Sequence, residues 1–78
     1  MPSTAQLLEF EAQHPGHPAG KQLAIESELG ISAARYYQLL GRAIDDAEAV
    51  KLDPMLVHRL RRLRERADSR RRAAQRVG

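Results

Sequence analysis

The sequence predicts an all-α protein: a small helical domain of about four helices that contains a helix-turn-helix, with a long basic C-terminal helix. Residues with high helix propensity dominate the 78 residues, and no stretch shows the period-two alternation of β-branched residues that is typical of a strand. We expect residues 1–67 to form the helical domain, with the helix-turn-helix at 20–42, and residues 68–78 to form an arginine-rich, partly flexible extension.

The length and composition exclude several classes of protein. A chain of this size buries only about 60% of the surface that its unfolded form exposes, which leaves little room for a catalytic cleft. It has no cysteine, so neither disulfides nor thiolate metal sites stabilise it. The sequence contains no apolar run of membrane-spanning length and no signal-peptide pattern near its start. We therefore expect a cytoplasmic protein with no membrane partner.

The charge is sorted along the chain. Residues 1–55 hold four basic and eight acidic residues, a net charge of −4, whereas residues 56–78 hold nine arginines and two acids, a net charge of +7; the two parts sum to the overall +3. A basic terminal segment of this kind is typical of proteins that bind a polyanion, usually nucleic acid.

The first and last helices have clear start signals. Ser3 is a good N-cap for a helix over residues 4–13, which the prolines and glycine of residues 14–18 must end. At the other end, Asp53 suits an N-cap and Pro54 the first position of a helix. That helix continues through the arginines and is expected to end between residues 67 and 75. Residues 46–52 form a short connection with room for one helical turn.

The helix-turn-helix is predicted from spacing around Gly30. This glycine can adopt the positive φ of the turn between a helix over residues 20–29 and a helix over residues 33–45, and Ser32 is a good N-cap for the second of them. The position four before the glycine is usually small but here is Glu26, so Ala24 must allow the close approach instead. Apolar residues are expected to lock the two helices together, at Ile25, Leu29, Ile31, Tyr36 and Leu39, and Leu23 is a further apolar position of the first of these helices.

If the motif is used on DNA, helix 33–45 is the recognition helix and its N-terminal end enters the major groove. Arg35 suits guanine and Gln38 suits adenine. Tyr36 is in phase with the leucines and is expected in the core, which leaves Tyr37 exposed. The residues expected to read bases are Ser32, Arg35, Tyr37, Gln38 and Arg42. The alternative is an ordinary helical hairpin whose apolar residues are simply core.

The C-terminal helix combines an apolar stripe with many arginines. The stripe consists of Leu56, Leu60, Leu63 and Ala67, and its leucines are expected either to form a homodimer seam or to pack on the first helix. The alternative for the arginines is a solvated face with pairs such as Arg61–Glu65 and Arg64–Asp68, but two acids cannot neutralise nine arginines. The residues expected to bind phosphates are Arg59, Arg61, Arg62, Arg64, Arg66, Arg70, Arg71 and Arg72.

No constellation of residues indicates catalysis or a cofactor. His14 and His17 lie in the Pro/Gly-rich loop without a neighbouring carboxylate or thiol, which does not make a metal site. Asp45 and Asp46 are adjacent on a predicted helix and so point apart. We expect no cofactor, no metal and no enzyme activity.

Three stretches carry a family resemblance: Arg-Tyr-Tyr-Gln-Leu-Leu at 35–40, the acidic pair at 45–46, and Asp-Pro-Met-Leu-Val-His-Arg-Leu-Arg-Arg at 53–62. With them, the sequence resembles a small actinobacterial domain family of unknown function over roughly residues 8–72. It departs from many relatives at residues 14–18, which replace an aromatic pair. The resemblance implies a helical regulator and supplies no activity.

Together these observations predict a DNA-binding protein, either a transcriptional regulator or a nucleoid-associated architectural factor. A single small motif binds weakly, so a two-fold dimer on paired half-sites fits this expectation. Two alternatives remain open from the sequence: a protein-interaction module that engages the transcription machinery, and RNA binding by the arginine segment.

Overall fold

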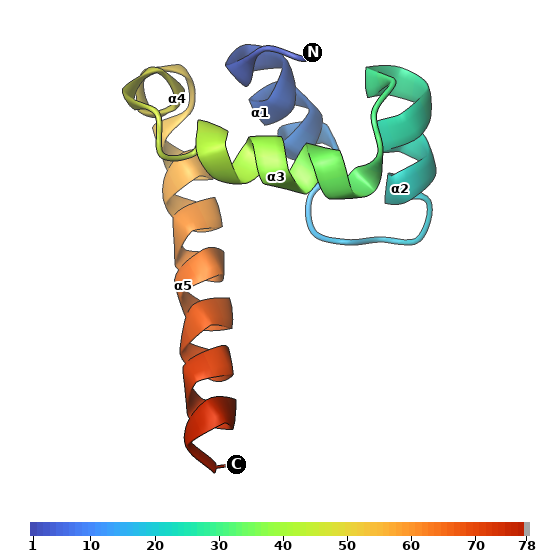
Figure 1. Cartoon of the computed structure of the whole chain (residues 1–78). Helices are drawn as coiled ribbons and strands as arrows, with labels where there is room; N and C mark the ends of the chain where they lie inside the picture. The colour runs from blue at the N-terminus through green and yellow to red at the C-terminus, as the bar shows by residue number, and fades with distance from the viewer. Residues whose placement is uncertain (78) are drawn as a thin grey trace.

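The computed structural model describes residues 1–77 and confirms the all-α prediction: within this range it contains helices and turns and no strand (Figure 1). Its elements in chain order are α1 (Thr4–Gln13), α2 (Lys21–Ala24), the π-helical turn η1 (Ile25–Leu29), α3 (Ala33–Ala43), α4 (Ala47–Leu52) and α5 (Pro54–Val77).

Helix α1 has the predicted bounds and the predicted cap. The Ser3 hydroxyl accepts a hydrogen bond from the backbone N–H of Gln6 at 3.2 Å, and the Gln6 side chain accepts one from the backbone N–H of Ser3 at 2.7 Å. This reciprocal pair satisfies two N–H groups that a helix start otherwise leaves without partners. Helix α1 therefore begins where the local sequence dictates.

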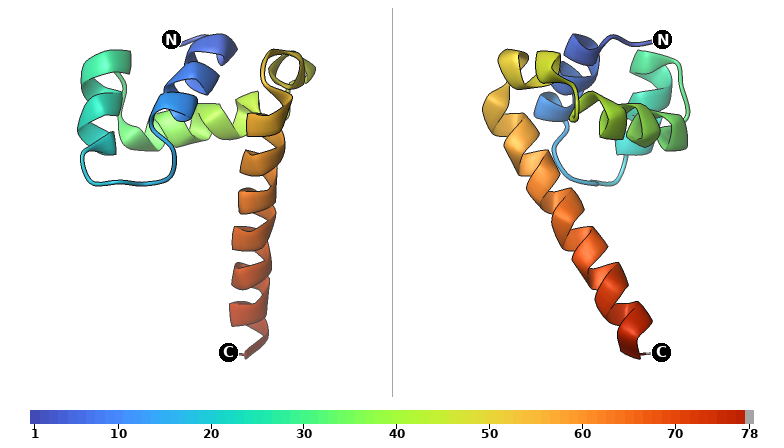
Figure 2. Two further views of the ribbon diagram at one scale, coloured as in Figure 1. Left: turned by 180° about the vertical axis from the view of Figure 1, so that it is seen from behind. Right: turned by 60° about the vertical axis from the view of Figure 1, so that its left-hand side comes forward.

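The turn between η1 and α3 also follows the prediction. Gly30 adopts a left-handed conformation with φ +70°, and its N–H donates to the carbonyl of Glu26 at 3.1 Å. Ser32 caps α3 by accepting from the N–H of Arg35 at 3.1 Å. Helix α3 ends at Ala43, two residues before the expected end. Figures 1 and 2 show α3 running at a steep angle to the α2–η1 segment. That these helices act as a helix-turn-helix stays a prediction.

The segment before this turn is less regular than predicted, because a π-helical turn replaces the second half of the expected helix. A π-helical turn holds more residues than an α-helical one and changes which side chains face inward. Ile25 is fully buried, Ala24 packs against the core, and Glu26 is exposed, so the glutamate does not occupy the packed side of this segment. Leu23 was expected to pack inward but is 71% exposed, because the inward face of α2 is occupied by Lys21 and Ala24.

The connection at residues 46–52 contains α4, whose N-cap Asp46 accepts from the N–H of Glu48 at 3.0 Å. Asp53 in turn caps α5 by accepting from the N–H of Leu56 at 3.2 Å, as predicted. Helix α5 continues to Val77, beyond the expected end between residues 67 and 75, because residues 68–77 contain neither proline nor glycine. The predicted flexibility of this segment stays a prediction.

Helix α5 projects from the rest of the molecule. In all views of Figures 1 and 2 its C-terminal part extends away from the other helices. The radius of gyration is accordingly 13.6 Å, against about 11.5 Å for a compact chain of this length. Only the N-terminal part of α5 contributes to the core, through Leu56 and Val57. Val57 is fully buried although it lies outside the predicted leucine stripe.

A buried ion pair lies inside the domain, between the side chains of Glu11 on α1 and Lys21 on α2. The Lys21 Nζ atom is 2.8 Å from the Glu11 carboxylate, and the two side chains are only 3% and 6% exposed. Lys21 also donates to the carbonyl of Gly16 at 2.7 Å, and the Tyr36 hydroxyl donates to Glu11 at 2.6 Å. Burial, followed by the hydrogen bond to Glu11, raises the pKa of Tyr36. These four residues form what we call the buried network.

Replacing Lys21 tests the buried network. Lys21→Met leaves the Glu11 carboxylate buried without its counter-ion, which should lower the free energy of unfolding at neutral pH by about 3–5 kcal/mol. The control is Lys51→Met, since Lys51 is exposed on α4 and its loss should change stability by less than about 0.5 kcal/mol. Urea unfolding followed by circular dichroism measures both, and equal losses would contradict a structural role for the network.

Two glycines provide a matched test of backbone conformation. An added Cβ meets no atom within 4 Å at either Gly30 or Gly41. Gly30→Ala should nevertheless destabilise the protein by about 1–2 kcal/mol, because its left-handed φ disfavours a side chain. Gly41→Ala lies inside α3 and should stabilise it by about 0.5–1 kcal/mol. The same unfolding curves would show opposite shifts, and a shift of the same sign in both variants would refute this account.

Candidate nucleic-acid interface

The predicted reading face lies on the outer side of α3. Arg35, Gln38 and Arg42 are spaced by three and four residues, which places them on one side of the helix, and all three are exposed. The opposite side of α3 packs into the core through Tyr36 and Leu40. Helix α3 therefore presents one polar face and one apolar face.

Two residues of this face are bonded to each other. The Arg35 guanidinium donates to the Gln38 side-chain oxygen at 2.8 Å, and its other terminal nitrogen is 3.8 Å from the Met1 sulfur. The Gln38 amide can still donate, and the guanidinium still holds further N–H groups. The pair thus offers an array of donors, fixed by one internal hydrogen bond. Arg42, one turn beyond Gln38, is exposed at the same face.

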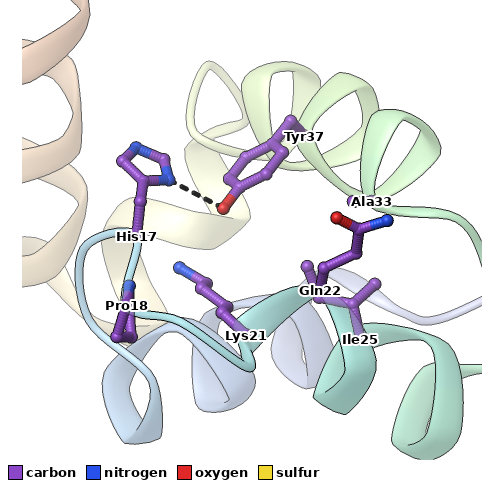
Figure 3. A pocket seen from close by; sticks show the side chains of 7 residues that line it. All are labelled: His17, Pro18, Lys21, Gln22, Ile25, Ala33 and Tyr37. Atoms are coloured by element: carbon purple, nitrogen blue, oxygen red, sulfur yellow. Dashed lines mark hydrogen bonds between the residues drawn. The ribbon is translucent and has the colours of Figure 1, made fainter.

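The other two residues expected to read bases have structural contacts instead. The Ser32 hydroxyl accepts the capping hydrogen bond from Arg35. Tyr37 was expected to be exposed, but it is half-buried, and its hydroxyl lies 2.8 Å from Nδ1 of His17. Tyr37 and His17 line a pocket of about 210 Å³ together with the stem of Lys21 (Figure 3). Tyr37 turns towards the first loop because Lys21, 5.6 Å from its ring centre, forms a cation–π contact there.

The arginines of α5 divide into two sets, and the first set holds the end of α3. Arg61 donates to the carbonyl of Ile44 at 2.7 Å. Arg64 makes a bidentate pair with Asp45, at 2.8 and 3.0 Å, and lies 3.5 Å from the carbonyl of Gly41. The hydrogen bond from Arg64 lowers the pKa of Asp45 and raises the pKa of Arg64. We call these contacts the α3–α5 clasp.

The clasp engages two of the arginines that were predicted to bind phosphates. Arg61 and Arg64 were expected to bind phosphates, but both side chains are engaged with the C-terminal end of α3. They also do not form the pairs with Glu65 and Asp68 that the solvated-face alternative would give; of these two acids, Asp68 lies 3.8 Å from Arg71. The reason is that the last carbonyls of a helix lack backbone partners and carry partial negative charge, which attracts the guanidinium groups.

The second set of arginines forms a stripe along the projecting part of α5. Its members are spaced by three, four and four residues, so they share one face of the helix. All are exposed, and none makes an ion pair or a side-chain hydrogen bond with another residue that the structure describes. The arginine stripe consists of Arg59, Arg62, Arg66 and Arg70.

The stripe carries unbalanced positive charge. At 1.5 Å per residue it extends over roughly 16 Å, and arginines one turn apart repel one another. Asp68 lies on the other side of the helix by its spacing. Glu65 follows Arg62 by three residues and borders the stripe, so a single acid offsets the charge of four arginines there. Arg71 and Arg72, also expected to bind phosphates, are exposed outside the stripe. A partner with regularly spaced negative charges would remove this repulsion.

Two of the three leucines of the predicted dimer seam pack against the chain's own core. Leu56 is only 4% exposed and belongs to the core, and Leu60 is half-buried against it. Leu63 is 51% exposed. The first two leucines of this apolar stripe thus pack on the chain's own domain, where α5 contacts mainly α4; packing on the first helix, the stated alternative to a seam, is not what the structure shows. Dimerisation stays a prediction.

The remaining polar candidates have local contacts. His14 stacks on Phe10, with ring centres 4.2 Å apart, and its Nε2 atom is 3.6 Å from Glu28. Among the described residues there is no group of three or more potential ligands that would hold a metal ion. No helix within residues 1–77 has both the length and the apolar character needed to cross a lipid bilayer.

Comparisons with known proteins give one match. No curated protein and no solved structure matches the chain. Residues 2–73 match the model of a family described as a protein of unknown function, DUF3263. Since this match covers nearly all of the chain, the protein described here belongs to the DUF3263 family.

Proposed function

We propose that this protein binds double-stranded DNA, with α3 at the major groove and the arginine stripe of α5 on the phosphates. The observation that carries the proposal is the stripe itself: four exposed arginines on one face of a helix that projects from the domain, without acidic partners among the described residues. Each phosphate that an arginine neutralises releases counterions, which drives binding at low salt.

The length of the stripe fits the spacing of the phosphates. Along the axis of DNA each strand carries one negative charge per about 3.4 Å, so a stripe of about 16 Å faces roughly five phosphates of one strand. Arginine suits this contact because its planar guanidinium can bind phosphate in a bidentate manner. Affinity therefore comes mainly from α5.

Helix α3 supplies a modest base-reading function. Arg35, Gln38 and Arg42 point outward together, and Arg35 and Gln38 have the chemistry that recognises guanine and adenine. Because Ser32 accepts the capping bond of α3 and Tyr37 is half-buried against His17, we assign base contacts mainly to the other three of the five expected side chains. A weak reader joined to a strong phosphate contact fits either a transcriptional regulator or an architectural factor of the nucleoid.

The proposal concerns a binding protein and not an enzyme. The most deeply buried ionisable groups, Glu11, Lys21 and Tyr36, bond to one another, and the buried network gives them a structural role. RNA binding is tested against DNA binding in one experiment. Fluorescence anisotropy with duplex DNA, duplex RNA and single strands at two salt concentrations ranks the nucleic acids, and no binding at low salt would refute the proposal.

Single arginine variants separate the two contacts. Arg62→Ala should weaken binding to all duplexes alike and reduce the slope of log affinity against log salt by about 1, whereas Arg35→Ala should relax base preference. Lys51→Ala removes one exposed positive charge from α4 and serves as the charge-matched control, which should leave both quantities nearly unchanged. Salt titrations with a selected duplex and a scrambled one give these values. If Lys51→Ala has the same effect as Arg62→Ala, binding depends on net charge and not on the stripe.

A further inference from the structure

The α3–α5 clasp joins the two surfaces that the proposed function uses. Arg61 and Arg64 belong to α5, which carries the arginine stripe, and their partners Ile44 and Asp45 follow the last turn of α3, which carries the reading face. Asp45 lies 19 residues from Arg64 in the chain. The contacts at this junction therefore act between two helices that differ in direction (Figure 2).

The geometry of the clasp fixes an orientation and not only a distance. A bidentate guanidinium–carboxylate pair aligns two planar groups through two parallel hydrogen bonds. The bond from Arg61 Nε to the Ile44 carbonyl, at 2.7 Å, adds a second attachment one turn away on the same face of α5. Together with the buried Leu56 and Val57, these two attachments restrict rotation of α5 about its own axis, so they help to fix the side on which the arginine stripe lies.

The Arg64–Asp45 pair of the clasp is too exposed to be needed for folding. The side chains of Arg64 and Asp45 are 40% and 58% exposed, and exposed ion pairs contribute little to stability. The core that holds α5 in place is formed by Leu56 and Val57, near its start. A contact that adds little to stability but constrains orientation suits a role in positioning.

We infer that Asp45 is a positioning residue that sets sequence discrimination: through Arg64 it holds the arginine stripe in register with the reading face of α3. This inference rests on the proposed function. Phosphate contacts hold a protein on any duplex, and base contacts become selective only when those contacts fix the register. Asp45 also keeps Arg64 away from the phosphates, so its loss has two separate consequences.

Asp45→Asn should therefore steepen the salt dependence of DNA binding and lower the discrimination between duplexes. Arg64 becomes available to phosphate, so the salt dependence steepens by about 0.9, equal to a change of roughly 3.5-fold in the ratio of affinities at 50 and 200 mM salt. Discrimination between a duplex selected by the unmodified protein and a scrambled one should fall by about fivefold or more, because base contacts lose their register.

Two further variants make the test specific. Asp46→Asn removes the same charge one residue away, where the side chain caps α4 and not the clasp; it should leave discrimination unchanged. Arg64→Lys keeps the charge but cannot form the bidentate pair; it should lower discrimination as Asp45→Asn does. Circular dichroism confirms that each variant is folded. If Asp45→Asn and Asp46→Asn behave alike, the inference is wrong while the proposed function stands.

A measurement without DNA tests the orientation directly. The chain has no cysteine, so spin labels can be attached through Gln22→Cys on α2 and Ser69→Cys on α5, both exposed positions. The distance distribution between the labels should be narrow in the otherwise unmodified protein and in Asp46→Asn, and broader in Asp45→Asn. Equal widths in all three proteins would overturn the inference. Failure of the unmodified protein to bind any duplex would instead refute the proposed function, and this role of Asp45 with it.

Discussion

The ion pair between Glu11 and Lys21 is the interaction on which the arrangement of the helices depends. The pair joins α1 to α2, and it has two further partners: the Gly16 carbonyl in the first loop and the Tyr36 hydroxyl on α3. Two charges removed from water are costly unless their remaining hydrogen-bonding groups are satisfied. Here the network satisfies them, since no buried side-chain nitrogen or oxygen of the described residues lacks a partner. A shift of α2 would break both bonds of Lys21, and a shift of α3 would break the bond of Tyr36, so the network helps to hold the reading face of α3 in one position.

The parts of the fold that the sequence predicts are those determined by neighbouring residues. The caps at Ser3, Ser32 and Asp53 and the turn at Gly30 each depend on groups within four residues, and all four form as expected. The exposed Leu23 and the buried Lys21 show the limit of this reasoning. Periodicity assigns the apolar residue to the core, but a carboxylate ten residues earlier in the chain attracts the lysine inward and turns the leucine outward.

The same distinction explains what could be predicted of the candidate site. Composition and charge order indicate a polyanion-binding helix at the C-terminal end, and the spacing of Arg35, Gln38 and Arg42 places them on one face. Neither observation separates Arg61 and Arg64 from the other arginines, because their partners lie 17 and 19 residues earlier, at the end of another helix. A count of charges treats all arginines of α5 as equivalent. The structure separates the two that contact the end of α3 from those that lie on the exposed face of the helix. Likewise, Tyr37 leaves the reading face because His17 and Lys21 come from a loop whose course the sequence does not reveal.

On the proposed function, this division of the arginines has a consequence for how a small protein achieves selectivity. Every additional phosphate contact strengthens binding to all sequences alike, so nine free arginines would produce a tight but indiscriminate protein. A base contact adds about 1–3 kcal/mol of discrimination, but only where the side chain meets the correct base edge. With three polar residues on α3 there are few such contacts, and each depends on where α5 holds the duplex. The engagement of Arg61 and Arg64 with the end of α3 lowers the number of free phosphate ligands and links the remaining stripe to the reading face. A domain too small for a large recognition surface can in this way use two of its arginines to fix the orientation of two helices, and not to bind phosphates.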